Sequence, residues 1–467
     1  MEIEKMSKKL NIVMYPWFPF GHITPYLRLA NKLAKKGHTI SLFLPNKALQ
    51  KLASQNHYPN LITLIPITLP EVDGLPAGAE TTADFPFGSE APLWVAFDST
   101  RSFIESYLSG PLGSSVDIVF FDYACWLPSL ARERGIKSVF YVTGFIVHMA
   151  YVCPLGRGVP QGVRPLLGEA ELKESLPGFP SASEFKLRAY EAQCFDMTLS
   201  PSRSYFWWRL YRSVEESDGF CYKTCREMEG DFGDFFEKLY KKPVFWAGPA
   251  LPEPSTSEIG LDESVDEWLK GFDMGRVVYV ALGSELGLEI DHFHELVLGL
   301  ELTGLPFFAV LKPPKGYDTV ESALPEGFLE RMKQKGRIHD GWVQQQLILT
   351  HPSIGCFVTQ CGAASLSEAL ISQCQLVLLP QRGDQITNAR SMGGALKVGV
   401  EVEIGDEDSY VARDALSKAI LTVMEPLSEV GRLVRANHTY WRDFLTSDGL
   451  EDSYISRLVE DLRGFVG

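Results

Sequence analysis

The stretch that decides the fold is GCFVTQCGAASLSEAL, residues 355–370. An apolar run ends at Thr359, a cluster of small residues follows, and apolar residues then recur at helical spacing from Ser365 onward. The unpaired N–H groups and the dipole at the start of a helix favour an anion, and small residues let a ligand approach the backbone closely. The stretch therefore predicts a strand, a turn and a helix whose amino-terminal end binds an anionic group.

Alternating strands and helices extend in both directions from this stretch. Predicted strands lie at 10–16, 39–45, 116–123 and 137–144 in the first half, and at 275–284, 306–312, 355–359 and 375–380 in the second. Helical spacing follows several of them, at 23–38, 127–135 and 293–304, from Ser365, and after Asp384. The alternation predicts an α/β protein with two doubly wound, Rossmann-like domains facing each other across a cleft.

The length of 467 residues exceeds what one hydrophobic core usually supports, which also favours two domains. Proline, serine, threonine and acidic residues cluster without periodicity between the two halves. We therefore predict a domain over 1–248, a linker over 249–262 and a second domain over 263–467, whose last helix returns to the first domain. A ligand is expected in the crevice between them, at the carboxyl ends of the strands.

The composition is that of an ordinary globular protein, with 45% hydrophobic and 22% charged residues. A net charge of -15 argues against nucleic acid or an anionic membrane surface as the main partner. The eight cysteines are scattered without metal-ligand spacing, which indicates reduced thiols and no metal site. No targeting segment or bilayer-spanning run is recognisable, so we expect a cytoplasmic protein without stable membrane insertion.

Two strand ends carry polar side chains that a buried sheet does not need. His22 lies between the first predicted strand and the helix that follows it, and Asp122 lies at the end of the strand over 116–123. Taken alone, a histidine at a helix start is usually structural, and an aspartate after a parallel strand is often a helix cap. Together they can form a base whose imidazole is oriented by a carboxylate, an arrangement that turns a hydroxyl into a nucleophile.

The segment from Trp342 to Gln385, WVQQQLILTHPSIGCFVTQCGAASLSEALISQCQLVLLPQRGDQ, resembles the signature box of plant UDP-sugar-dependent glycosyltransferases. The motifs GHITP, VFFDYACW and VVYVALGSE also occur in the expected order, so the resemblance covers essentially the whole chain. It implies the GT-B fold, with an amino-terminal acceptor domain and a carboxyl-terminal UDP-sugar domain. It also implies direct, inverting sugar transfer with no metal and no cofactor beyond the UDP-sugar.

The resemblance assigns roles to the residues that match the family's motifs. His22 would be the general base and Asp122 its partner. The residues implied to bind the UDP-sugar are Thr143, Ser284, Trp342, Val343, Gln345, Gln360, Gly362, Ala364, Ser365, Glu368, Asp384 and Gln385. Among them, Trp342 would stack on uracil and Glu368 would accept the ribose hydroxyls. Oriented N–H groups at the start of the helix would stabilise the departing diphosphate.

Three positions depart from the common form of the box, which has histidine, tryptophan and asparagine where this chain has Gln360, Ala363 and Ala364. Small residues at 363 and 364 are similar to the branch that adds a sugar to the sugar of a flavonoid or terpenoid glycoside. Glu285 and the opening GWVQQQLIL favour the same branch. A charge-assisted bond to phosphate is worth roughly 1.5–3 kcal/mol against about 1 for a neutral one, so Gln360 predicts weaker donor binding.

The residues expected to contact the acceptor are Trp17, Phe18, Phe20, Trp126, Phe145 and Glu285, although an aromatic cluster is more often simply core. Gln385 favours glucose as the donated sugar, and we expect a monomer. Three alternatives stay open: transfer to the aglycone hydroxyl, a nucleotide-sugar epimerase or hydrolase, and a non-catalytic UDP-sugar-binding protein with a degenerate phosphate cradle. The retained His22 and Asp122 favour a transferase.

Overall fold

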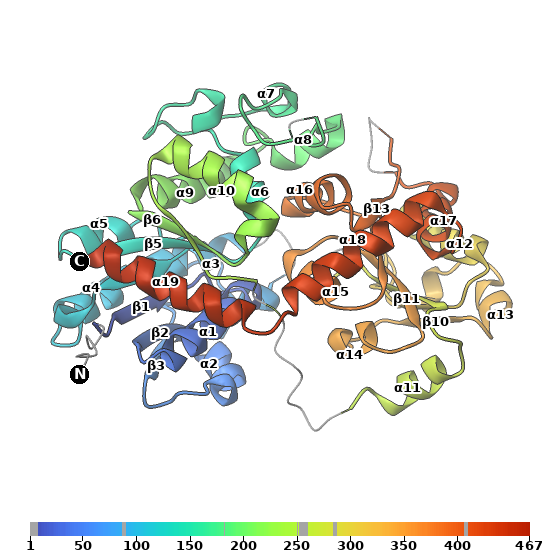
Figure 1. The fold of residues 1–467 in the computed structure, drawn as a ribbon, viewed down its shortest axis with the longest axis horizontal. Helices are drawn as coiled ribbons and strands as arrows, with labels where there is room; N and C mark the ends of the chain where they lie inside the picture. Colours follow the sequence, from blue (N-terminus) through green and yellow to red (C-terminus); the bar gives the residue numbers. More distant parts are fainter. Residues whose placement is uncertain are drawn as a thin grey trace, which may run out of the picture.

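Two parallel β-sheets, one in each half of the chain, organise the molecule (Figure 1). The computed structural model describes residues 8–85, 90–181, 183–249, 251, 260–283, 287–405 and 410–467. The strands of the amino-terminal lobe are β1 (Asn11–Tyr15), β2 (Thr39–Pro45), β3 (Ile62–Ile67), β4 (Ile118–Phe121), β5 (Lys137–Val142), β6 (Gly219–Tyr222) and β7 (Val244–Trp246). Those of the carboxyl-terminal lobe are β8 (Val277–Ala281), β9 (Phe307–Val310), β10 (Gly336–His339), β11 (Ile354–Thr359), β12 (Gln375–Leu378) and β13 (Gly399–Glu401).

In each sheet, successive strands are added first on one side of the first strand and then on the other. The point of this reversal is where a ligand-binding crevice is expected. The amino-terminal order is β3-β2-β1-β4-β5-β6-β7, so the chain reverses between β1 and β4, where Tyr15 lies opposite Phe121. The other order is β10-β9-β8-β11-β12-β13, with the reversal between β8 and β11, where Ala281 lies opposite Thr359. At such a switch point neighbouring helices leave on opposite faces, which opens a crevice at the carboxyl ends of the strands.

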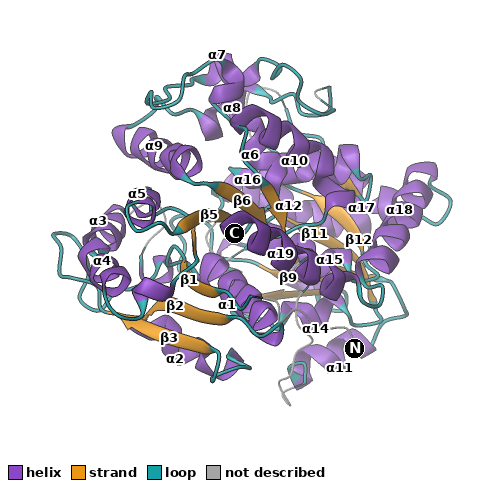
Figure 2. Ribbon diagram, turned by 60° about the vertical axis from the view of Figure 1, so that its left-hand side comes forward, coloured by secondary structure: helices purple, strands orange, loops and turns teal. Residues whose placement is uncertain are grey.

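Helices cover both faces of each sheet, as Figure 2 shows with the strands lying between them. The amino-terminal lobe has α1 (Phe20–Lys35), α2 (Asn46–Leu52), α3 (Ala91–Ser99), α4 (Arg101–Ser109), α5 (Leu127–Arg132), α6 (Ile146–Tyr151), α7 (Glu169–Lys173), α8 (Ala189–Phe195), α9 (Pro201–Glu216) and α10 (Arg226–Tyr240). The later helices are α11 (Glu263–Lys270), α12 (Ile290–Thr303), α13 (Phe328–Met332), α14 (Gln345–Leu349), α15 (Ala363–Leu370), α16 (Asp384–Arg390), α17 (Arg413–Met424), α18 (Glu429–Leu445) and α19 (Leu450–Val466). The central strands, such as β1, β4, β8 and β11, are mostly buried and apolar, as expected for strands covered on both faces.

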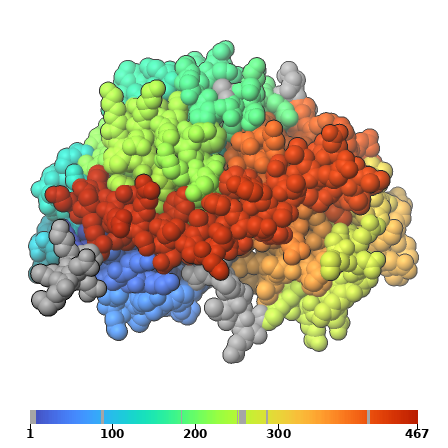
Figure 3. Space-filling model, in the orientation of Figure 1, coloured from blue at the N-terminus to red at the C-terminus, as the bar shows by residue number. Residues whose placement is uncertain are grey.

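The last helix returns to the first lobe. Helix α18 packs on the carboxyl-terminal sheet, whereas α19 packs against β7 and α1 (Figure 1). The rings of Phe245 and Phe465 lie 5.2 Å apart, and Lys36 donates to Asp452 at 2.8 Å. In the space-filling view α18 and α19 form one continuous band over both lobes (Figure 3). The chain therefore passes between the lobes twice, once after β7 and once between α18 and α19.

A buried ionic cluster also joins the lobes. Arg390, on α16, donates to both carboxylate oxygens of Glu191, on α8, at 2.6 and 2.8 Å. Arg390 also pairs with Glu401, and Arg188 lies 3.0 Å from Glu191 and 3.5 Å from Glu401. Two arginines and two glutamates thus balance each other in a site where Glu191 is fully buried. We call these four residues the interlobe cluster.

The expected fold class is confirmed, and two helix boundaries are corrected. Helix α1 begins at Phe20 and α15 at Ala363, whereas the sequence placed these helices from 23 and from Ser365. The earlier start puts His22 inside the first turn of α1, with its N–H bonded to the carbonyl of Pro19. Residues 252–259 of the predicted linker lie outside the described residues. In the described part of the chain, no helix is long and apolar enough to cross a membrane.

Candidate active site

A cavity of about 760 Å³ is lined by residues of both lobes. It contains the side chains that follow β1 and β4 in one lobe and the starts of α15 and α16 in the other. Predicted site residues in its wall are Phe20, His22, Asp122, Thr143, Phe145, Ala364, Glu368, Asp384 and Gln385. A second cavity of about 710 Å³, lined by His351 and Arg432 among others, lies at the amino ends of β8 and β11. Sheets of this type bind ligands at the opposite edge, so the first cavity is the candidate site.

His22 and Asp122 come together because β1 and β4 are adjacent and parallel. Nδ1 of His22 lies 2.8 Å from Oδ2 of Asp122, and Oδ1 of Asp122 accepts the backbone N–H groups of Trp17 and Tyr123, each at 2.7 Å. Three donors therefore converge on a carboxylate that is 2% exposed. An ionised carboxylate only accepts, so Nδ1 carries the ring proton and Nε2 keeps a lone pair. A partly exposed imidazole held in this tautomer can accept a proton from a ligand hydroxyl.

The turn between β11 and α15 presents bare backbone to the other side of the cavity. No side chain caps α15, whose N-cap is Gly362. Cys361 adopts φ 69°, a left-handed conformation uncommon for a residue with a side chain, and its carbonyl accepts the Asn388 side chain at 3.0 Å. The amide of Gln360 fills the space where a Cβ on Gly283 would sit, at the end of β8. The turn is therefore held against α16 and β8 while the N–H groups at the uncapped start of α15 remain available to an anion.

Glu368 is prepared to bind a further donor. Its carboxylate accepts the amide of Gln345 at 2.7 Å and that of Gln346 at 3.1 Å, and Gln345 also donates to Ser365. These bonds fix the carboxylate and leave lone pairs for a diol. Trp342 is 85% exposed, so its ring face is open to a flat ligand. The carbonyl of Val343 accepts the N–H of Gln345 at 2.9 Å, which shapes the same segment.

The start of α16 adds two polar side chains to the cavity wall. Asp384 accepts from Asn388 at 3.1 Å. Gln385 accepts the N–H groups of Gln381 and Arg382 at 3.1 and 3.2 Å through its Oε1, which leaves its amide nitrogen as a donor. Thr143, at the end of β5, lines the opposite wall. These groups can bond several hydroxyls of one small polar ligand.

Three expected acceptor contacts lie outside the cavity wall, and for these the expectation is corrected. Trp17 is 4% exposed and stacks on Trp94 with ring centroids 3.5 Å apart, and Phe18 is fully buried. Trp126 donates its indole N–H to Asp98 at 3.0 Å. The turn before α1 directs Trp17 and Phe18 toward α3, so these two pack in the core, whereas Trp126, at the start of α5, is half-buried against α3. Ser284 and Glu285 lie outside the described residues.

Several cavity residues were not anticipated from the sequence. They are Thr24, Arg28, Tyr123, His148, Phe206 and Lys223. Lys223 directly follows β6, so the strand-end criterion that selected Asp122 applies to it as well. His148 contacts Thr387 of the other lobe, Nδ1 to Oγ1, at 3.3 Å, and burial lowers the pKa of its ring. Arg28 lies on a helix whose sequence shows an apolar face, which does not reveal that this residue lines a cavity.

Solved structures identify the class of fold. A UGT transferase of Siraitia grosvenorii in complex with UDP matches with a TM-score of 0.74 at 22% identity, covering 97% of this chain and 100% of that one. A Medicago truncatula glycosyltransferase complexed with UDP-glucose matches with a TM-score of 0.74 at 21% identity, covering 99% and 100%. Two doubly wound lobes with a shared cavity at both switch points are thus the GT-B fold.

Sequence comparison then gives the family. The profile described as UDP-glucoronosyl and UDP-glucosyl transferase matches residues 329–426. A cyanidin 3-O-galactoside 2''-O-xylosyltransferase of Actinidia chinensis var. chinensis is 48% identical over 98% of this chain and 99% of its own length. An anthocyanidin 3-O-glucoside 2''-O-glucosyltransferase of Ipomoea purpurea is 48% identical over 98% of each chain. The chain belongs to the UDP-glycosyltransferase family, and the predicted resemblance is confirmed.

Proposed function

We propose that this enzyme transfers a sugar from a UDP-sugar to a hydroxyl on the sugar of a flavonoid glycoside, with inversion at the anomeric carbon. The observation that carries the proposal is the 2.8 Å contact between His22 and Asp122 in the same cavity as the uncapped start of α15. The names of the Actinidia and Ipomoea relatives support a glycoside acceptor and a glucose or xylose donor. Of these donors we propose glucose.

The proposed step is a single displacement. Nε2 of His22 takes the proton of the acceptor hydroxyl while that oxygen bonds to the anomeric carbon. The bond between this carbon and the diphosphate oxygen breaks, and its electron pair leaves with UDP. Asp122 stabilises the imidazolium, and the N–H groups at the start of α15 stabilise the charge gained by the diphosphate. Glu368 would hold the ribose, and Asp384 with Gln385 would orient the transferred sugar.

The base assignment is tested with His22→Ala. We expect loss of transfer by at least about a hundredfold, the usual contribution of a general base, with the affinity for UDP unchanged. Product formation and UDP calorimetry measure the two quantities. His57→Ala, at an exposed position of the same lobe, is the matched control and should change neither. Equal loss of transfer and of UDP binding would make His22 a structural residue.

The acceptor assignment is tested with a panel of UDP-sugars against anthocyanidin 3-O-glucosides and the corresponding aglycones, with mass detection of products. We expect a second hexose on the glucosides from UDP-glucose, and fragmentation that places it on the first sugar. Transfer to the aglycones alone would refute the sugar-sugar assignment. Free UDP-glucose breakdown without any acceptor product would favour a hydrolase.

We also propose that no metal takes part and that the enzyme is a cytoplasmic monomer. The backbone donors of α15 support a metal-free diphosphate site. All eight cysteines are free thiols, which supports a reducing compartment. We expect full activity after dialysis against EDTA and a mass near 52.1 kDa in light scattering. Activity that falls on dialysis and returns with Mg²⁺ or Mn²⁺ would contradict the metal-free site.

A further inference from the structure

Two cations of the amino-terminal lobe, Arg28 and Lys223, line the shared cavity. Arg28 lies on α1, less than two turns after His22, and Lys223 directly follows β6. Lys223 is only 8% exposed although it carries an ammonium group. A buried charge is costly unless it is paired, so its presence in a cavity wall calls for a ligand. The chain as a whole is acidic, with a net charge of -15, whereas this part of the cavity wall carries two positive charges.

Neither cation forms an ion pair at contact distance with a carboxylate of the described residues. Other cations of this lobe do: Lys32 pairs with Glu451, and Arg209 pairs with Asp98. Arg203, also in the cavity wall, donates to the carbonyl of Gln193 at 2.9 Å. Burial, and then the positive charges of Arg28 and Lys32, lower the pKa of Lys223 to about 8. An anion bound beside Lys223 would reverse this effect, since opposite charge favours the protonated form.

The opposite wall identifies which part of a ligand these cations reach. Glu368, on α15, lines the same cavity as Lys223, and its negative charge acts on the ammonium. Ala363 and Ala364, at the uncapped start of α15, line the same space. The position where the family commonly has a histidine is the neutral Gln360. An anion at the start of α15 would thus be contacted by neutral donors from one lobe and by two cations from the other.

We propose that Arg28 and Lys223 bind the diphosphate of the nucleotide sugar from the amino-terminal lobe. This proposal rests on the proposed function and adds residues to its donor site. The two cations neutralise the charge that UDP gains as the glycosidic bond breaks, whereas the start of α15 offers neutral N–H donors to the same charge. Both lobes therefore bind the leaving group.

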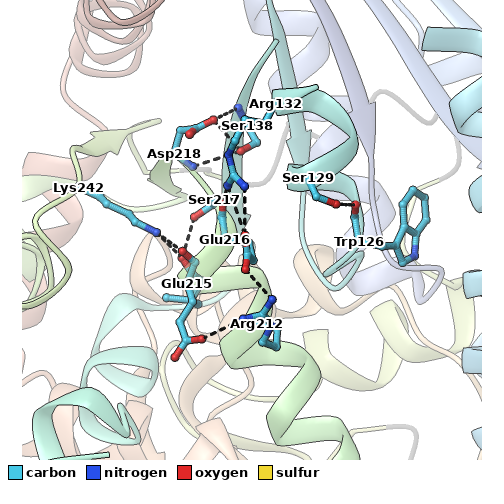
Figure 4. A network of polar contacts seen from close by, with 11 residues as sticks. Trp126, Ser129, Arg132, Ser138, Arg212, Glu215, Glu216, Ser217, Asp218 and Lys242 are labelled. Carbon is cyan, nitrogen blue, oxygen red and sulfur yellow. Dashed lines mark hydrogen bonds and ion pairs between the residues drawn. The ribbon is translucent and has the colours of Figure 1, made fainter. Parts of the chain in front are cut away.

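The test is the ratio of affinities for UDP and uridine, measured by calorimetry on the full chain. Because only UDP carries the diphosphate, Lys223→Met and Arg28→Met should each weaken UDP binding about tenfold or more and leave uridine unchanged. Lys223→Arg should keep most of the UDP affinity. The matched control is Lys242→Met, since burial also lowers the pKa of Lys242 to about 8. Its ammonium donates to the carbonyl of Val214 at 3.1 Å and to that of Glu215 (Figure 4), and Lys242 is not among the residues that line the cavity. This control variant should leave the ratio unchanged.

Two results would overturn the proposal. One is an unchanged ratio in both methionine variants. The other is a loss confined to turnover with acceptors that carry a carboxylate, which would assign the cations to the acceptor. Failure of the proposed function gives a different pattern, because it would show as a wild-type chain that transfers no sugar to glycosides, whatever the ratio of UDP to uridine affinity in the variants. Melting temperatures of the variants show whether each is folded before its affinities are compared.

Discussion

Single residues decide how strongly this cavity can hold a diphosphate, and Gln360 is the clearest case. Its amide lies over Gly283 at the switch point, beside the turn that starts α15. Gln360→His would replace a neutral donor with one that can carry charge. We expect the KM for the UDP-sugar to fall about fivefold, since the gain of a charge-assisted bond over a neutral one is about 1 kcal/mol. Initial-rate kinetics with varied donor concentration measure this change.

The control for this prediction is Gln373→His, at an exposed position near the amino ends of the strands. It should leave the KM for the donor and for the acceptor unchanged. An unchanged or higher donor KM in Gln360→His would show that this side chain does not face the phosphates. The prediction concerns the donor alone, so an effect on acceptor KM of equal size would indicate a shift of the whole turn.

Among single residues, the sequence predicted the polar residues of the cavity better than the aromatic ones. His22 and Asp122 follow apolar strands, where the position of a side chain in a parallel sheet is set by the strand end. Trp17 and Phe18 belong to the same strand end, but an aromatic side chain is equally suited to a core or to a cavity wall. Only the packing of α3 against that turn decides between the two. Hydrophobic character alone therefore does not identify acceptor contacts.

At the scale of elements, helix α10 supports the wall of the cavity through one carboxyl group. Glu229, where α10 is kinked, accepts the N–H of Val147 in α6 at 3.0 Å, and α6 follows the cavity residues Thr143 and Phe145. Burial raises the pKa of Glu229 from 4.5 to about 7. Between these two pH values the folded chain holds a proton that the unfolded chain has lost, so the free energy of unfolding falls as pH rises.

This sign gives a prediction for Glu229→Gln, whose amide resembles the protonated carboxyl. From pH 4.5 to 7 the wild type should lose about 2 to 3 kcal/mol relative to the variant, and the difference should stay constant above pH 7. Urea unfolding at a series of pH values measures it. Glu237→Gln, exposed on the same helix, should follow the wild type. A difference that grows toward low pH would contradict the raised pKa.

The elements themselves were predictable where strands are apolar and helices carry a clear period. The strands at 10–16 and 39–45 are examples, because both are buried on two faces. Strands β3, β6, β7, β10 and β13 were not recognised, because Pro66 interrupts the pattern of β3 and the other four have only three or four residues, which leave little periodicity. Helix α1 starts earlier than expected because Pro19 and Phe20 begin the helix before its apolar period becomes visible.

At the scale of the whole molecule, the interlobe cluster connects donor-site geometry to the placement of the lobes. Arg390 ends α16, whose first residues Asp384 and Gln385 line the cavity, and it binds Glu191 of the other lobe. Arg390→Met would leave a buried carboxylate without this cation. We expect the free energy of unfolding to fall by about 3 kcal/mol, because removing one partner exposes the other to an uncompensated desolvation cost. Chemical unfolding measures the loss.

A double variant separates the contribution of charge from that of side-chain shape to the free energy of unfolding. Glu191→Leu combined with Arg390→Met removes both charges, so it should recover part of the stability lost in Arg390→Met alone. Arg331→Met is the control, because Arg331 pairs with Glu301 at 2.5 Å within one lobe and is 46% exposed. Its effect on the free energy of unfolding should be much smaller, because solvent screens an exposed ion pair. A double variant less stable than Arg390→Met would mean that shape outweighs charge in the cluster.

The return of α19 to the first lobe restricts how the two lobes can move relative to each other. Two polypeptide crossings, after β7 and before α19, restrain the lobes at two separate points. One connection between the lobes would allow them to rotate in any direction. Two connections leave rotation about the line that joins the two connections as the easiest motion. Donor entry and product release would then depend on the same motion, the opening and closing of the cleft between the lobes. Severing the chain between 445 and 450 would release the torsional restraint without touching a single cavity residue.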